Sequence, residues 1–150
     1  MKTHPQPTLK IMTDFYIKTN LTDVLRFRLY LYRAPFTCAA FIKILPFSLD
    51  LYHPNSARKE IWTSRGPELK VQPENSSVLL TPGEIAIGPL VSNDTRTSRP
   101  LGICYGEAKP IGNCNVFGKV FHEDLEVLKI LGRTIWRKGH LKLKFETSYI

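Results

Sequence analysis

Prolines and glycines interrupt this sequence along its whole length. Eleven prolines and nine glycines are spread over 150 residues. Many turns between short elements are typical of β-rich proteins. A chain of this length suits one domain, with enough residues to bury a substantial core. The spread of prolines and glycines, together with the chain length, therefore predicts a single domain built mostly of short strands.

One segment shows the strand pattern directly. Residues 24–32 alternate, with Leu25 and Phe27 on one face and Arg26 and Arg28 on the other. The remaining predicted strands cover residues 9–18, 60–63, 69–71, 76–80, 84–89, 101–106, 115–121, 133–137 and 140–146. The last two form a predicted hairpin.

Two isolated helices are expected among these strands. Pro35 suits a first helical position, and residues 35–45 form an apolar helix that Pro46 stops. This helix is expected to be buried on most sides, as a plug at a barrel mouth would be. A second helix covers residues 124–131, and Gly132 ends it. Many strands with two helices favour a closed antiparallel barrel capped at its ends.

The formal net charge of +8 has two interpretations. A basic C-terminal region is compatible with a patch for nucleic acid or another polyanion. Alternation gives the other interpretation, in which Leu141, Leu143 and Phe145 point inward while Lys142 and Lys144 face water. We favour the solvated face, because no aromatic-rich RNA-binding strand and no helix-turn-helix pattern accompanies the charge.

The three cysteines, Cys38, Cys104 and Cys114, are odd in number and not closely spaced. They are expected to be small buried hydrophobes in a reducing compartment. The sequence has no export signal and no apolar run of membrane-spanning length, so a cytoplasmic location is expected. The four histidines lack the spacing of zinc ligands, and no glycine-rich phosphate loop is present. We expect neither a metal nor a cofactor.

Two segments carry a family resemblance. Residues 33–41 (RAPFTCAAF) resemble the strand-to-helix junction of cyclophilins, and residues 115–120 (NVFGKV) resemble a late cyclophilin strand. Shorter matches to small prokaryotic cyclophilin-like proteins are Leu45-Pro46, Glu60-Ile61-Trp62, residues 82–86, Tyr105-Gly106 and residues 131–136. The resemblance covers residues 9–146 and leaves residues 1–8 and 147–150 as tails. It implies a closed cyclophilin-like barrel of about eight strands with two capping helices.

The resemblance also implies a ligand groove on the outer surface of the barrel. The residues expected to bind the ligand there are Trp62, Ile87, Tyr105, Asn113 and Phe117. Taken one at a time, strand aromatics are more often core packing than pocket walls.

Two function classes stay open: a module that binds a peptide or small molecule, and a weak peptidyl-prolyl isomerase. For the isomerase, Arg58 is the candidate catalytic residue, although the family's Phe-His-Arg strand is missing. A nucleic-acid accessory protein is less favoured, and the sequence leaves the oligomeric state open.

Overall fold

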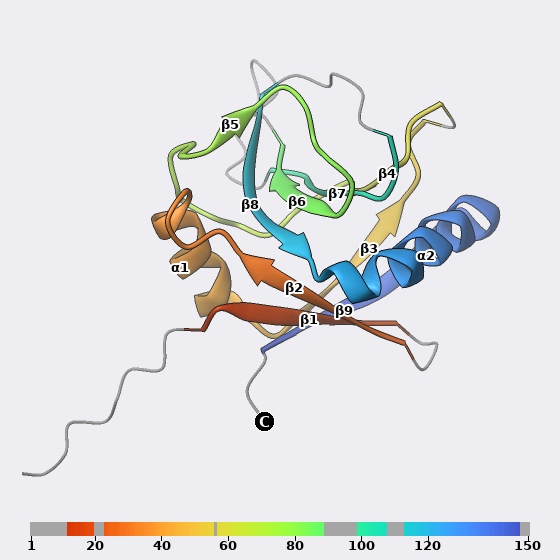
Figure 1. Cartoon of the computed structure of the whole chain (residues 1–150), viewed down its shortest axis with the longest axis horizontal. Helices are drawn as coiled ribbons and strands as arrows, with labels where there is room; N and C mark the ends of the chain where they lie inside the picture. The colour runs from red at the N-terminus through yellow and green to blue at the C-terminus, as the bar shows by residue number, and fades with distance from the viewer. Residues whose placement is uncertain (1–11, 20–22, 56, 89–98, 108–112, 148–150) are drawn as a thin grey trace, which may run out of the picture.

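The computed structural model describes residues 12–19, 23–55, 57–88, 99–107 and 113–147 (Figure 1). The predicted tail over residues 1–8 and the start of the predicted strand at residue 9 lie outside these ranges. Of the predicted C-terminal tail, only Thr147 is described, and it belongs to the last strand.

The helices and strands follow one another along the chain in this order. They are β1 (Asp14–Lys18), β2 (Val24–Leu29), α1 (Pro35–Ile44), β3 (Phe47–Tyr52), β4 (Glu60–Thr63), β5 (Ser76–Ser77), β6 (Glu84–Ile87), β7 (Leu101–Cys104), β8 (Cys114–Val120), the 3-10 turn η1 (His122–Asp124), α2 (Leu125–Lys138) and β9 (His140–Thr147).

Eight of the strands close into a barrel. Each runs antiparallel to its neighbours in the order β2-β1-β9-β3-β4-β7-β6-β8, and β8 pairs back onto β2. The two-residue strand β5 is added outside this ring, along β8. In Figure 1 the helix α1 lies at one end of the barrel and α2 runs along its opposite side. The predicted closed, mainly β barrel with two helices is confirmed.

Phenylalanine rings fill the barrel interior around α1. Phe41 is fully buried, and its ring centroid lies 4.8 Å from that of Phe15 on β1 and 4.8 Å from that of Phe117 on β8. Edge and tilted contacts of this kind are favourable beyond the buried area alone. The predicted plug is therefore present, but α1 buries only one side, since Phe36 on the same helix is 74% exposed.

A distant carboxylate holds the start of α1. The N-cap residue is Ala34, which has no side-chain acceptor for the free amides of the first turn. Glu74 takes that role: its oxygens accept from Phe36 N at 3.1 Å, from Thr37 N at 2.5 Å and from Thr37 Oγ1 at 2.7 Å. Asn115 on β8 steadies the arrangement by donating to Thr37 Oγ1 at 2.9 Å and accepting from Glu74 N at 3.2 Å.

The hydrogen bonds from Phe36 and Thr37 to the Glu74 carboxylate predict an acid-sensitive contribution to the stability of the fold. Burial raises the pKa of Glu74, but the hydrogen bonds from Thr37 and Phe36 outweigh it and hold the pKa below its usual value. A carboxylate whose folded pKa is depressed stabilises the fold above its unfolded pKa of about 4.3, and that stability is lost as pH falls through the folded pKa. Glu74→Gln should cost about 1 kcal/mol at neutral pH.

The measurement is urea unfolding from neutral pH to pH 3. The Glu74→Gln curve should fall less steeply with acid than the wild-type curve, whereas Asp23→Asn, at an exposed carboxylate, should leave the slope unchanged. If the free energies of unfolding of wild type and Glu74→Gln fell equally with acid, Glu74 would not stabilise the start of α1 through its carboxylate.

The predicted C-terminal hairpin is wrong in its first half. Residues 133–137 continue α2, which runs to Lys138 and ends at Gly139 with φ of +95°. Gly132 lies inside the helix, where the Tyr105 ring packs against it; a Cβ there would meet Tyr105 Cε1 at 2.4 Å. The glycine therefore serves a close approach to β7 and does not terminate the helix.

Three further sequence expectations need correction. Residues 47–52, between α1 and β4, form the strand β3, which the sequence analysis did not predict. Residues 69–71 form no strand, although Leu69 is buried in the core. The predicted strand over residues 76–80 shrinks to Ser76–Ser77. The last strand agrees with prediction, with Leu143 and Phe145 buried and its lysines exposed.

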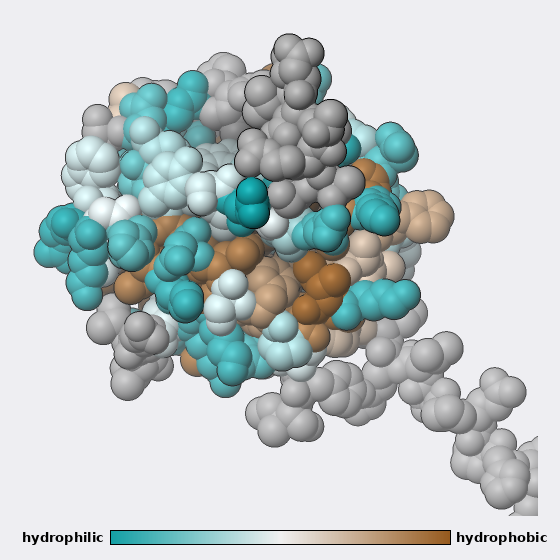
Figure 2. Space-filling view, turned by 180° about the vertical axis from the view of Figure 1, so that it is seen from behind, coloured by the Kyte–Doolittle hydropathy of each residue, from teal (hydrophilic) through white to brown (hydrophobic). Residues whose placement is uncertain are grey.

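Of the neighbouring strands in the closed barrel, β3 and β4 have the shortest pairing. These strands pair through only two positions, Leu51 with Thr63 and Tyr52 with Trp62. The earlier residues Phe47 and Leu49 face the interior but stay partly exposed. Figure 2 shows hydrophobic residues across the middle of the rear face, bordered by hydrophilic ones.

Within the described part of the chain, no helix has the length and apolar character needed to cross a membrane.

Candidate functional site

Two of the residues expected to bind a ligand lie inside the barrel. Ile87 is 2% exposed and Phe117 is fully buried, both within the main core. Side chains alternate along a strand, so Ile87 and Phe117 point inward while their neighbours Ala86 and Val116 point outward. The expected groove on the outer face therefore cannot be lined by Ile87 or Phe117.

Trp62 and the candidate catalytic residue Arg58 meet at a buried carboxylate. Glu60 is 2% exposed and accepts from Trp62 Nε1 at 3.1 Å. Arg58 Nη1 lies 3.6 Å from the other Glu60 oxygen. The Trp62 ring also packs over Gly102, where a Cβ would approach it to 2.4 Å. Arg58 is thus held by a structural carboxylate.

The remaining two expected residues lie apart from this group. Asn113 is exposed just before β8. Tyr105 is buried, and its hydroxyl lies 2.6 Å from His53 Nε2. The residues expected from the sequence therefore do not gather in one groove.

The cysteines offer no reactive thiol. All three are free and buried, and burial raises the pKa of Cys38 to about 12 and those of Cys104 and Cys114 to about 11. A thiol with so high a pKa carries little thiolate at neutral pH. Among the described residues, no three His, Cys, Asp or Glu side chains gather in a way that would hold a metal ion.

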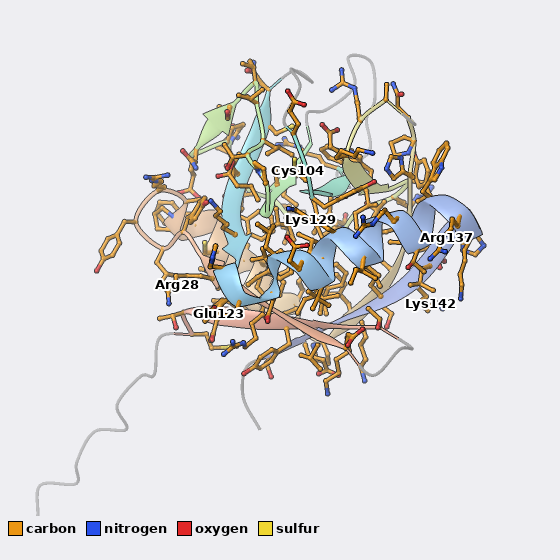
Figure 3. The ribbon with its side chains drawn as sticks, turned by 45° about the vertical axis from the view of Figure 1, so that its right-hand side comes forward. Arg28, Cys104, Glu123, Lys129, Arg137 and Lys142 are labelled. Carbon is orange, nitrogen blue, oxygen red and sulfur yellow. The ribbon has the colours of Figure 1, made fainter. Side chains whose placement is uncertain are left out.

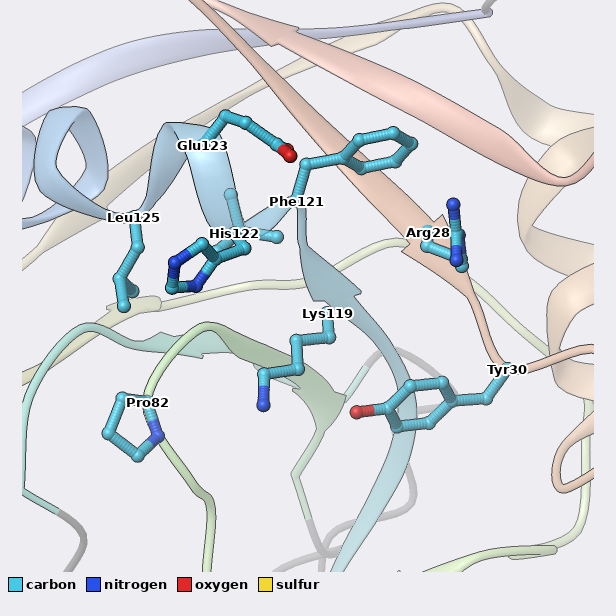
Figure 4. Close-up of a pocket in the computed structure, with 9 residues that line it drawn as sticks. Arg28, Tyr30, Pro82, Lys119, Phe121, His122, Glu123 and Leu125 are labelled. Carbon is cyan, nitrogen blue, oxygen red and sulfur yellow. The ribbon is translucent and has the colours of Figure 1, made fainter.

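A cavity of about 620 Å³ lies outside the barrel where β2 meets β8 (Figure 4). Its lining residues are Arg28, Tyr30, Pro82, Lys119, Val120, Phe121, His122, Glu123 and Leu125. A second hollow of about 730 Å³ shares Arg28, Tyr30 and Lys119 with it and adds Arg33. We call the two together the β2–β8 groove, and their volumes lie in the range of small-molecule sites.

Two cations lie on neighbouring strands in this groove. In the antiparallel register of β2 and β8, Arg28 pairs directly with Lys119. Both side chains are exposed, and like charges directly opposite in a sheet repel. Within the described residues, neither Arg28 nor Lys119 forms an ion pair. The groove therefore holds two cations that form no ion pair within the described residues, and Glu123 is an acid in its lining.

The nearest acid on the neighbouring strand is already engaged. Glu84 on β6 lies opposite Lys119 on its other side. Its two oxygens accept from Tyr30 Oη at 2.9 Å and from Thr81 N at 2.8 Å. Burial and the Glu84 hydrogen bond raise the pKa of Tyr30, which keeps its phenol protonated at neutral pH. Figure 4 shows the Tyr30 hydroxyl and the Lys119 ammonium both directed into the pocket.

Aromatic rings form the walls beside these cations. The Phe121 ring lies 4.6 Å from the Arg26 guanidinium and 5.0 Å from that of Arg28. The Tyr30 ring lies 5.4 Å from that of Arg33. Such cation–π contacts orient guanidinium groups without neutralising them. Arg26 differs from the other two arginines because Asp124 offsets its charge: Arg26 Nε lies 3.5 Å from Asp124 Oδ2.

The sequence carried part of this signal. The alternation of β2 places Arg26, Arg28 and Tyr30 together on the outward face, and the sequence analysis already assigned Arg26 and Arg28 to the same face. It could not show that Lys119, about ninety residues later, lies beside Arg28, because that requires the β2–β8 pairing.

Comparison with protein families matches residues 23–147 to the model of DUF3830, described as a protein of unknown function. The chain belongs to the DUF3830 family. The DUF3830 match includes all the strands of the closed barrel except β1, and it spans the whole β2–β8 groove apart from Thr13. No curated protein matches the chain.

Two solved structures resemble this DUF3830 chain in fold. The first is McbB in complex with tryptophan, with a TM-score of 0.66 and 14% identity over 91% of this chain and 45% of McbB. The chain thus spans less than half the length of McbB. The second is the solution structure of the hypothetical protein AF2241 from Archaeoglobus fulgidus, with a TM-score of 0.59 and 16% identity over 92% of this chain and 96% of AF2241. At these identities the likeness shows the fold alone.

Proposed function

We propose that this DUF3830 domain binds a small aromatic carboxylate in the β2–β8 groove. The observation that carries the proposal is the cross-strand pair of Arg28 and Lys119. A carboxylate between them would relieve their repulsion and accept charge-assisted hydrogen bonds, which are stronger than neutral ones. The guanidinium of Arg28 also suits the planar, two-pronged shape of a carboxylate.

The walls of the groove favour a flat ring attached to that carboxylate. Tyr30 and Phe121 supply aromatic surface, and Pro82 and Leu125 supply aliphatic surface on the same cavity. A pocket with apolar walls and a few polar groups can orient a ligand through its charged end. The structural neighbour McbB was solved with tryptophan, which combines a carboxylate with a flat ring. Tryptophan is the ligand of McbB, and here it only guides the choice of indole compounds as probes.

Calorimetric titration with indole-3-acetate and indole-3-acetamide tests the proposal, because the two share a ring and differ in the anionic group. The acetate should bind and the acetamide should bind at least about tenfold more weakly, as expected for the loss of charge-assisted hydrogen bonds. Arg28→Gln and Lys119→Gln should each weaken acetate binding by about tenfold or more.

The control is Lys142→Gln, which removes one exposed positive charge from β9. Figure 3 shows Lys142 at the opposite side of the molecule from Arg28. Because Arg28→Gln also removes a like-charge repulsion, it should leave stability unchanged or raise it by a few tenths of a kcal/mol. Equal affinity for acetate and acetamide, or equal losses in the Arg28 and Lys142 variants, would reject the groove as a carboxylate site.

A weak peptidyl-prolyl isomerase is the alternative, and it has less support. Arg58 lies beside the buried Glu60, and the side chains of Ile87 and Phe117 are inside the barrel, so they offer no surface to a proline ring. Catalysis would require groups that stabilise the twisted amide more than the planar one. We expect a coupled assay on an Ala-Pro peptide to show no acceleration. Acceleration that Arg58→Ala abolishes would restore the isomerase hypothesis.

A further inference from the structure

A second cavity lies between α2 and the end of β7, apart from the β2–β8 groove. Its volume is about 410 Å³, and it is lined by Ala57, Lys59, Tyr105, Gly106, Glu107, Lys129 and Arg133. None of these residues lines the β2–β8 groove. Figure 3 places Lys129 on the stretch of α2 near Cys104, with Arg28 beyond the start of the helix. We call this cavity the α2 pocket.

Positive charge gathers in the α2 pocket from two parts of the chain. Lys129 and Arg133 are four residues apart on α2, where like charges share a face and repel. Lys59 joins them from the segment before β4, and Glu107 is the lone acid of the lining. Lys129 also contacts Glu126 at 3.1 Å, but within the described residues Lys59 and Arg133 form no ion pair.

The floor of the pocket supplies no negative charge. Tyr105 and His53 are joined at 2.6 Å through the phenol oxygen and Nε2. Burial raises the pKa of Tyr105, and the charge of Arg133 lowers it by less, so the pKa stays above its usual value. Burial and the nearby charge of Lys59 lower the pKa of His53. Tyr105 and His53 are therefore both neutral at physiological pH. Arg133 lies close enough to shift the pKa of Tyr105, and Lys59 lies close enough to shift that of His53.

Two glycines let wall residues of the pocket pack closely against the backbone. A Cβ on Gly106 would lie 2.7 Å from Lys59 Cβ, and a Cβ on Gly132 would lie 2.4 Å from the Tyr105 ring. The side chain of Lys59 thus lies flat along the backbone of residue 106, and Tyr105 fits against α2. Both contacts fix the positions of wall residues, and preorganised walls lower the entropic cost of binding.

We propose that the α2 pocket binds the phosphate group of a small phosphate monoester. Of the three cations that line the pocket, Lys129 is paired with Glu126, whereas Lys59 and Arg133 form no ion pair within the described residues. A phosphate dianion can contact both of these unpaired cations at once. The guanidinium of Arg133 can form two parallel hydrogen bonds to phosphate oxygens, and the lysines add point charges. The cavity is larger than an inorganic phosphate ion, which leaves space for the organic part of the ester.

Calorimetric titration of the full chain with glycerol phosphate tests this proposal, with inorganic phosphate as a second ligand. Glycerol phosphate should bind, and inorganic phosphate should bind more weakly. Arg133→Gln should weaken binding by about tenfold or more. Arg133 is exposed, so the variant is expected to fold, and Lys59→Gln provides a second, independent variant with the same expected direction.

Two control variants locate the site. Arg137→Gln removes an equal charge one helical turn further along α2, on a residue that does not line the pocket, and should leave the dissociation constant unchanged. Arg28→Gln should also leave it unchanged, which separates this site from the β2–β8 groove. No binding of glycerol phosphate, equal losses in the Arg133 and Arg137 variants, or binding of RNA without binding of the monoester would each overturn the proposal.

Discussion

Replacing Phe41 by alanine is expected to lower the free energy of unfolding by about 3–5 kcal/mol, the usual cost of truncating a buried phenylalanine. Phe41 is fully buried, and its ring contacts those of Phe15, Phe47, Phe117 and Phe145. The variant loses the transfer free energy of the ring and leaves a cavity that the barrel strands cannot collapse to fill. Chemical denaturation with an unchanged denaturant slope measures this loss.

Phe36→Ala is the matched control, since it removes the same side chain from the same helix. Phe36 is 74% exposed, and its backbone amide still donates to Glu74 after the substitution. We expect a change within about 0.5 kcal/mol, as for most surface substitutions. Similar losses in the two variants would mean that α1 does not insert Phe41 into the barrel.

Gly132→Val is expected to destabilise the fold by roughly 1–3 kcal/mol, the range for overpacking a tight contact. A Cβ at this position would lie 2.4–2.6 Å from three carbons of the Tyr105 ring, which is itself buried. Either α2 must move away from β7 or the Tyr105 ring must leave its contact with His53. Denaturant unfolding gives the magnitude, and the amide shifts of residues 53 and 105 report the displacement.

Arg137→Val controls for helix propensity, because it adds the same β-branched residue to an exposed turn of α2. Its cost should stay below about 0.7 kcal/mol. If residues 133–137 formed a strand instead, valine at 137 would be favourable and valine at 132 would meet no ring. A Gly132→Val variant as stable as wild type would contradict the position of α2.

Side-chain alternation made most of the barrel predictable. It placed β2 and β9 correctly, because each has one apolar and one polar face along its length. It failed where a local signal had two meanings. Gly132 reads as a helix terminator, yet it lies inside α2 because Tyr105 approaches there, a contact between segments far apart in sequence. The apolar run through Pro46 concealed β3 in the same way, since most of its pairing is with β9, which is distant in the sequence.

The candidate site was harder to predict than the fold. Arg28 and Lys119 each look like an ordinary solvated residue of an alternating strand, and only the closing pair of the barrel places them opposite each other. The groove expected from the family resemblance included Ile87 and Phe117, whose inward direction depends on the register of β6 and β8. Tyr105, which the sequence analysis expected in that groove, instead lines the α2 pocket.

The most direct test of the proposed carboxylate site is a titration of isotope-labelled protein with indole-3-acetate, followed through the amide chemical shifts. We expect the largest shifts at Arg28, Tyr30, Lys119 and Phe121, which line the β2–β8 groove. These shifts should be lost in the Arg28→Gln variant and kept in Lys142→Gln. Shifts confined to Trp62 and Asn113, with Arg28 and Lys119 unmoved, would contradict the proposed site.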